Sequence, residues 1–98
     1  MQIVKTNENG KLSVSLEGRL DTMTAPELEA AVKDDLATVT SATIDLEKLE
    51  YVSSAGLRVI LSIHKALAPK EGLTIKNPNE TVSEVFEVTG FSDILNIE

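Results

Sequence analysis

The chain has 98 residues, with 9 Lys and Arg against 16 Asp and Glu, a formal net charge of −7, no Cys and one His. This length fits one domain, and the absence of Cys excludes disulfides, thiolate nucleophiles and cysteine-based metal sites. The acidic balance disfavours nucleic acid and anionic membranes as partners, and no apolar run is long enough to span a bilayer, so we expect a cytoplasmic protein.

The N-terminal segment contains two runs rich in strand-forming residues, at 2–6 and 11–17. In the second run, apolar residues occupy every second position, which is typical of a strand with one buried face. The dipeptide Asn9-Gly10 between the runs is favoured in hairpin turns. We therefore predict a β-hairpin, with the chain leaving the sheet at Gly18.

A helix and a short strand are predicted next. Thr24 and Glu27 have the spacing of a capping box, and Pro26 is tolerated in a first helical turn. From Leu28 onward, apolar residues recur at i, i+3, i+4 and i+8, which indicates an amphipathic helix of about three turns. The following strand covers residues 42–46.

The C-terminal half alternates between helix and strand. Residues 54–68 are the most apolar helical segment, and residues 72–76 form another strand. Asn77 is placed to cap a third helix that ends at Gly90, and residues 94–97 read as a last strand. The predicted order, β-β-α-β-α-β-α-β, is typical of an α/β fold with helices packed on a mixed sheet of four to five strands.

Few residues are available for catalysis. Ser54 and His64 lie ten residues apart on one predicted helix, about 15 Å along its axis, whereas a general base must come within about 3 Å of its nucleophile. A triad with Asp45 is therefore excluded. The single His and the scattered carboxylates form no metal-ligand pattern, and the glycines match no phosphate-binding loop. We predict a protein that is not an enzyme and has no cofactor or metal.

Two hydroxyl groups stand at the start of the apolar helix, on Ser53 and Ser54. A serine there can cap the helix by accepting a hydrogen bond from an amide of the first turn. The same place favours an anion, because of the free amides and the helix dipole, so phosphorylation of Ser54 is a second interpretation. The two interpretations are compatible. Gly56, which lacks a Cβ, is expected to open the surface beside these hydroxyls.

Two stretches resemble a known family. Residues 18–28 read GRLDTMTAPEL, and residues 44–57 read IDLEKLEYVSSAGL. They are similar to the patterns G-x-[LI]-D-x-x-[TN]-[AV]-x-x-[LF] and D-L-S-x-[VL]-x-[YF]-[ILM]-D-S-[ST]-G-L of the STAS domain (sulfate transporter and anti-sigma factor antagonist). Within that family, the chain resembles the free-standing bacterial anti-sigma factor antagonists. The resemblance covers the whole chain and implies a single STAS-like domain over residues 1–98.

The resemblance implies a partner-switching role in the regulation of transcription. An unphosphorylated antagonist binds an anti-sigma factor that is also a serine kinase, phosphorylation of one serine releases it, and a serine phosphatase reverses the change. That serine falls on Ser54, with Ser53 as the alternative. The implied partner-binding residues are Asp21, Ser53, Ser54, Ala55, Gly56, Leu57 and Arg58. We expect a monomer.

Departures from the family pattern cluster around Ser54. The usual Asp before the phosphoacceptor is Ser53, the following Ser or Thr is Ala55, and a usual Gly is Arg58. Arg58 lies four residues after Ser54, where it can pair with a phosphate or simply be solvated. These departures keep an alternative open, namely a STAS-like non-catalytic subunit that docks constitutively to another assembly, such as a lipid-transport ATPase complex.

Overall fold

Five strands form one mixed sheet in the computed structural model, which describes residues 1–98. The strands are β1 (Gln2–Glu8), β2 (Lys11–Leu20), β3 (Ser41–Val52), β4 (Gly72–Lys76) and β5 (Asn96–Ile97). They lie side by side in chain order, with β1 antiparallel to β2 and each later pair parallel. The helices are α1 (Ala25–Val32), α2 (Ser54–Leu67) and α3 (Glu80–Val88). The predicted α/β class and order of elements are confirmed.

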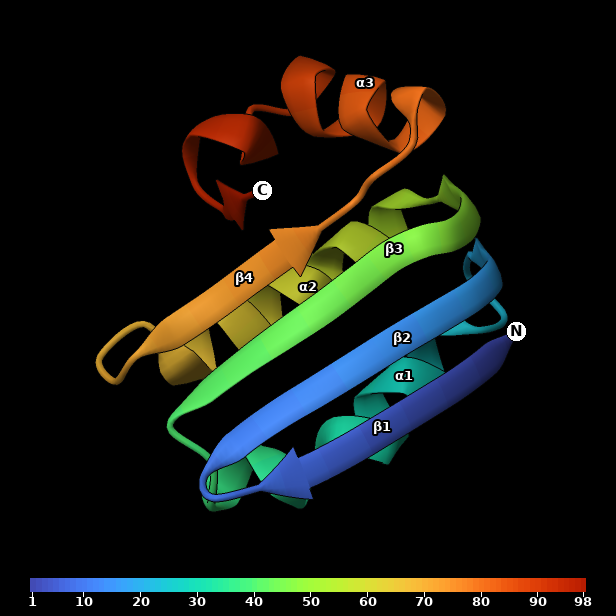
Figure 1. Cartoon of the computed structure of the whole chain (residues 1–98). Helices are drawn as coiled ribbons and strands as arrows, with labels where there is room; N and C mark the ends of the chain where they lie inside the picture. The colour runs from blue at the N-terminus through green and yellow to red at the C-terminus, as the bar shows by residue number, and fades with distance from the viewer.

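Helices α1 and α2 cover the same face of the sheet, and α3 lies beyond the ends of β3 and β4 (Figure 1). The alternating residues Leu12, Val14 and Leu16 of β2 are almost fully buried. The core contains 23 buried side chains, all of them apolar, and no charged or polar side chain is buried. The fold therefore depends on burial of apolar surface, at roughly 25 cal/mol per Å².

Helix α2 buries one side and exposes the other. Ile60, Ile63 and Leu67 are at most 2% exposed, at the i, i+3, i+7 spacing of a helix face. Arg58 and Lys65 are exposed on its opposite side. The outer side of α2 is thus free to take part in recognition without changing the core.

The other face of the sheet carries no helix (Figure 1). There Ser13 and Ser15 of β2 pair in register with Thr43 and Asp45 of β3. These residues line a shallow hollow of about 310 Å³. The face is polar, as the alternation within the hairpin predicted.

Two strands run further than predicted. The chain does not leave the sheet at Gly18, because β2 continues to Leu20, and the strand predicted at 42–46 extends to Val52. Two register shifts interrupt the β2–β3 pairing before it resumes at their C-terminal ends. Such irregularities break the alternation of buried and exposed residues. The alternation in the sequence therefore stops before the strands do, and the predicted strands were too short.

The first helix is shorter than predicted. Helix α1 ends at Val32 and is followed by a short 3₁₀ turn, η1 (Asp35–Ala37). Lys5 of β1 donates to the Ala31 carbonyl at 2.6 Å and forms an ion pair with Asp35. In a continuing helix the Ala31 carbonyl would accept from the Asp35 N–H, whereas here it accepts from Lys5, a residue of another element, where the helix ends.

Helix α3 is capped by a different residue from the one predicted. Asn77 was expected at the cap, but it adopts a left-handed conformation (φ +57°) outside the helix. Asn79 is the N-cap: its Oδ1 accepts from the Val82 N–H at 2.8 Å, and its Nδ2 donates to the Leu49 carbonyl at 2.9 Å. The capping residue is thus also bonded to strand β3.

The C-terminal features agree more closely with the sequence. Gly90 follows the C-cap of α3 with φ +82°, as a helix-ending glycine does. Of the strand predicted at 94–97, only Asn96–Ile97 pairs with β4. No helix of the chain has the length and apolar character needed to cross a bilayer.

We expect Asn79→Ala to lower the free energy of unfolding by about 1–2 kcal/mol, because it removes both the cap and the bond to β3. Asn77→Gly is the control, since glycine adopts a positive φ freely. It removes only an exposed 3.3 Å bond from Asn77 Nδ2 to Asp45, so we expect a change within about 0.5 kcal/mol. Urea unfolding followed by circular dichroism measures both. Equal losses in the two variants would contradict the cap at Asn79.

Candidate functional site

The sequence-predicted site residues gather at the C-terminal ends of β2 and β3. These strands are parallel, and Leu20 and Val52 are paired at their ends. The loop that leads to α1 begins directly after Leu20, and α2 begins directly after Val52 and Ser53. Ligand sites of open α/β sheets commonly lie at this edge. The topology therefore brings Asp21 and the two serines, more than thirty residues apart in the chain, to one edge of the domain.

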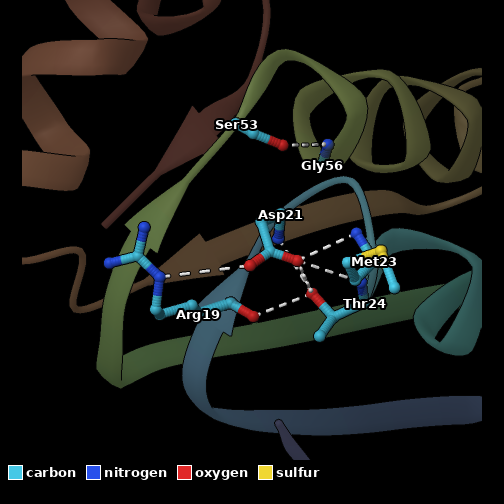
Figure 2. A network of polar contacts seen from close by, with 6 residues as sticks. All are labelled: Arg19, Asp21, Met23, Thr24, Ser53 and Gly56. Carbon is cyan, nitrogen blue, oxygen red and sulfur yellow. Dashed lines mark hydrogen bonds and ion pairs between the residues drawn. The ribbon is translucent and has the colours of Figure 1, made fainter.

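The two serine hydroxyl groups have different environments. Ser53 is the N-cap of α2: its Oγ accepts from the Gly56 N–H at 3.3 Å (Figure 2). Its own N–H donates to the Leu20 carbonyl at 2.8 Å, which ties it to the end of β2. Ser54, the first residue of α2, is exposed and its hydroxyl makes no hydrogen bond within the protein. Only the Ser54 hydroxyl is therefore free of a structural bond.

Gly56 allows α2 to approach the end of β2. A Cβ at this position would lie 2.6 Å from Leu20 Cγ and 3.0 Å from the Leu20 carbonyl oxygen. Gly56 is buried, so the expectation that it opens the surface is wrong: the space left by the missing Cβ is filled by Leu20. Leu57 is also buried, at 5% exposure. Both residues shape this edge from within and offer little surface to a partner.

Asp21 organises the loop between β2 and α1. Its Oδ1 accepts from the N–H groups of Met23 and Thr24, at 3.0 and 3.1 Å (Figure 2). Thr24 Oγ1 in turn accepts from the Asp21 N–H and donates to the Arg19 carbonyl, both at 2.8 Å. The predicted capping box of Thr24 with Glu27 is wrong, because Thr24 makes no side-chain cap bond in α1. Its reciprocal partner is Asp21, three residues earlier.

These bonds lower the pKa of the Asp21 carboxyl below its ordinary value of 3.8. The Thr24 N–H is the largest cause, the Met23 N–H and the Thr24 hydroxyl add to it, and the Arg19 charge contributes least. Partial desolvation acts in the opposite direction without reversing the sign. The carboxylate is therefore ionised throughout the neutral range, and this edge of the domain holds a fixed negative charge.

Arg19 is a site residue that sequence reasoning missed. Its guanidinium lies 4.4 Å from the centroid of the Tyr51 ring, and its Nε lies 4.0 Å from Asp21 Oδ2. Arg19 and Tyr51 are cross-strand partners only because of the register shifts between β2 and β3. No local pattern signals this pairing. The contact holds the arginine beside the loop and away from α2.

Arg58 and Ala55 line a hollow between the first turns of α1 and α2. The hollow has a volume of about 190 Å³, and its lining residues are Thr22, Ala25, Pro26, Glu29, Ala55, Arg58 and Val59. Arg58 is exposed, and it makes no ion pair or side-chain hydrogen bond. The structure holds no group of three His, Asp or Glu side chains placed to bind a metal.

Comparison with known proteins supports the resemblance seen in the sequence. A family model described as "Mlab, STAS domain" matches residues 4–96. The chain is 33% identical to BtrV of Bordetella bronchiseptica, provisionally named an anti-sigma factor antagonist, over 99% of this chain and 85% of that one. It is 30% identical to the anti-sigma-B factor antagonist of Bacillus subtilis, over 96% of this chain and 86% of that one.

Solved structures share the fold. The anti-sigma factor antagonist SpoIIAA in its unphosphorylated form superposes with a TM-score of 0.84 at 21% identity, over 99% of this chain and 88% of that one. The Bacillus cell fate determinant SpoIIAA in its phosphorylated form superposes with a TM-score of 0.77 at 20% identity, over 99% and 91% of the two chains. The likeness therefore extends over the whole domain.

We expect Gly56→Ala to destabilise the protein by about 1–3 kcal/mol, because the new Cβ overlaps Leu20. In an open helix position the same change would instead stabilise by up to about 1 kcal/mol. The sign of the change in unfolding free energy therefore shows whether the close contact exists. Ser62→Ala, on the exposed side of α2, is the control and should be neutral or slightly stabilising. Thermal and urea unfolding measure the effects, and a stabilised Gly56→Ala would refute the close contact.

We expect the stabilising effect of Asp21 to depend on pH. Because its pKa is lower in the folded chain than in the unfolded chain, the carboxylate stabilises the fold above pH 3.8, and this contribution is lost as the pH falls through the lowered pKa. Asp21→Ala should be less stable than the wild type at pH 7, with the difference shrinking in acid. Asp21→Asn keeps an acceptor oxygen but does not titrate. Urea unfolding between pH 7 and 3 is the measurement, and a constant difference would contradict the role of the charge.

Proposed function

The chain belongs to the STAS domain family, and from this we propose that it is an anti-sigma factor antagonist in a partner-switching pathway. The relatives support this role, because two named anti-sigma factor antagonists match nearly the full length of the chain at 33% and 30% identity. In the proposed pathway, the unphosphorylated chain binds an anti-sigma factor that is also a serine kinase. Binding releases the sigma factor.

We propose Ser54 as the switch. The observation that carries this choice is its free hydroxyl at the exposed start of α2. In the phosphorylation step, Ser54 Oγ bonds to the γ-phosphorus of ATP, the bond to the bridging β-phosphate oxygen breaks, ADP leaves and the hydroxyl proton is released. A serine phosphatase reverses the step by hydrolysis. The free hydroxyl can enter a kinase site without breaking a bond within the protein.

Ser53 is the weaker choice for the same step. Its hydroxyl accepts the Gly56 N–H, and its backbone N–H is bonded to β2. Moving Ser53 into a kinase active site would uncap α2, at a cost of about 1 kcal/mol. In this proposal Ser53 supports the helix start on which Ser54 is presented.

Release follows from charge. A phosphate adds about −1.5 to −2 charges at an edge that already holds the ionised Asp21. The proposed partner surface consists of Asp21, Ser53, Ser54, Ala55 and Arg58, with Gly56 and Leu57 beneath it. A buried charge without a partner at the centre of an interface is costly. A loss of about 3 kcal/mol of binding free energy weakens binding roughly 150-fold.

Incubation with MgATP and an anti-sigma factor kinase from the same genome tests the proposal. We expect one added phosphate, on Ser54, in the wild type and in Ser53→Asn, which keeps a good cap without a hydroxyl. Ser54→Ala should take up no phosphate and bind the kinase constitutively, whereas Ser54→Asp should bind weakly. Intact mass, peptide mapping and calorimetry are the measurements.

Two outcomes would overturn the proposal. One is phosphate on Ser53 alone, which would reassign the switch. The other is no phosphate at all, with equal binding of Ser54→Ala and Ser54→Asp to their partner. That second result would favour the alternative of a STAS-like subunit that docks constitutively.

A further inference from the structure

Arg58 is an unpaired cation one helical turn after Ser54. Both residues are exposed on α2, and residues i and i+4 lie on the same side of a helix. Arg58 is the first basic residue of α2, followed only by His64 and Lys65 near the C-terminal end. Its guanidinium is therefore within reach of a group attached to the Ser54 hydroxyl.

The charged groups around Arg58 leave it available. Glu29 of α1 lines the same hollow but forms no ion pair with Arg58 within 4.0 Å. The Asp21 carboxylate is occupied by the Met23 and Thr24 amides. Arg19, the other arginine at this edge, lies on the Tyr51 ring. No carboxylate competes in the structure for the guanidinium of Arg58.

We propose that Arg58 is a built-in counter-ion that pairs with phosphorylated Ser54 and holds the phosphate against α2; this inference rests on the proposed function. The order of charges is the favourable one for a helix, with the acid four residues before the base. A guanidinium offers two parallel N–H donors to a phosphate, which makes such pairs stronger than lysine pairs. Arg58 stands where the family pattern has glycine, so the pairing would be a property of this chain.

The pairing gives Arg58 two opposite effects on the switch. In the unphosphorylated chain, the free guanidinium is available to an acidic group of the partner. After phosphorylation, the phosphate pairs with this guanidinium, which is then no longer available to the partner. The phosphate carries about −1.5 to −2 charges and Arg58 only +1, so the pair keeps a net negative charge on the docking surface. Phosphorylation then adds that charge and also costs the partner its contact with the Arg58 guanidinium.

The test uses the full chain with phosphoserine installed at position 54 during translation, so that it needs no kinase. Phosphorus NMR measures the second pKa of the phosphate. We expect Arg58→Gln to raise that pKa by about 0.3 or more, because a nearby cation favours the dianion. The control is Lys65→Gln, which removes the same charge from an exposed site on α2, about 16 Å along the axis from position 54. It should shift the pKa by less than about 0.1, and 1 M NaCl should shrink the Arg58 effect.

Equal values in the phosphorylated wild type and Arg58→Gln would overturn the inference, as would an equal rise in Lys65→Gln, which would reveal only the general field of the protein. Unphosphorylated Arg58→Gln should unfold like the wild type, since Arg58 is exposed and unpaired. A kinase that fails to modify Ser54 would defeat the proposed function without touching this measurement. The two failures are therefore distinguishable.

Discussion

The close contact of Gly56 with Leu20 is the constraint on which this edge of the domain depends. Leu20 fills the space where a Cβ would lie, and its carbonyl oxygen accepts the Ser53 N–H. Because Leu20 ends β2 and Gly56 lies in the first turn of α2, this contact fixes the helix start against the sheet. It places the start of α2, and with it the exposed Ser54, beside the end of β2, from which the Asp21 loop begins.

At this edge some polar side chains are hydrogen-bonded within the protein and others are not. The side chain of Ser53 forms a hydrogen bond at the start of α2, and those of Asp21 and Thr24 form hydrogen bonds within the loop. The side chains of Ser54 and Arg58 form no hydrogen bond or ion pair within the protein. In the proposed switch, a phosphate therefore alters the charge of an already ordered surface and leaves the apolar core intact. The proposed role, as a kinase substrate and a docking surface, asks for no catalytic group in the chain itself.

Predictions that rest on the pattern of one short segment agree best with the structure. The alternation in β2 and the glycine that ends α3 are properties of short segments, and the structure confirms them. The errors lie where a distant group intervenes. Lys5 binds the Ala31 carbonyl and Asp35 just where α1 ends, and the Leu49 carbonyl binds the amide of Asn79, which caps α3 in place of Asn77.

The order of the elements, the family motifs and the two hydroxyl groups at the start of α2 can all be read along the chain, because periodicity and motif spacing are local properties. Which serine caps the helix and which stays free is visible only in the folded chain. The folded chain also shows that Gly56 is filled by Leu20, and that Arg19 is held by Tyr51 while Arg58 is not held. These outcomes depend on strand register and on the approach of α2 to β2, which are set by packing between segments about thirty residues apart, and no local pattern encodes them.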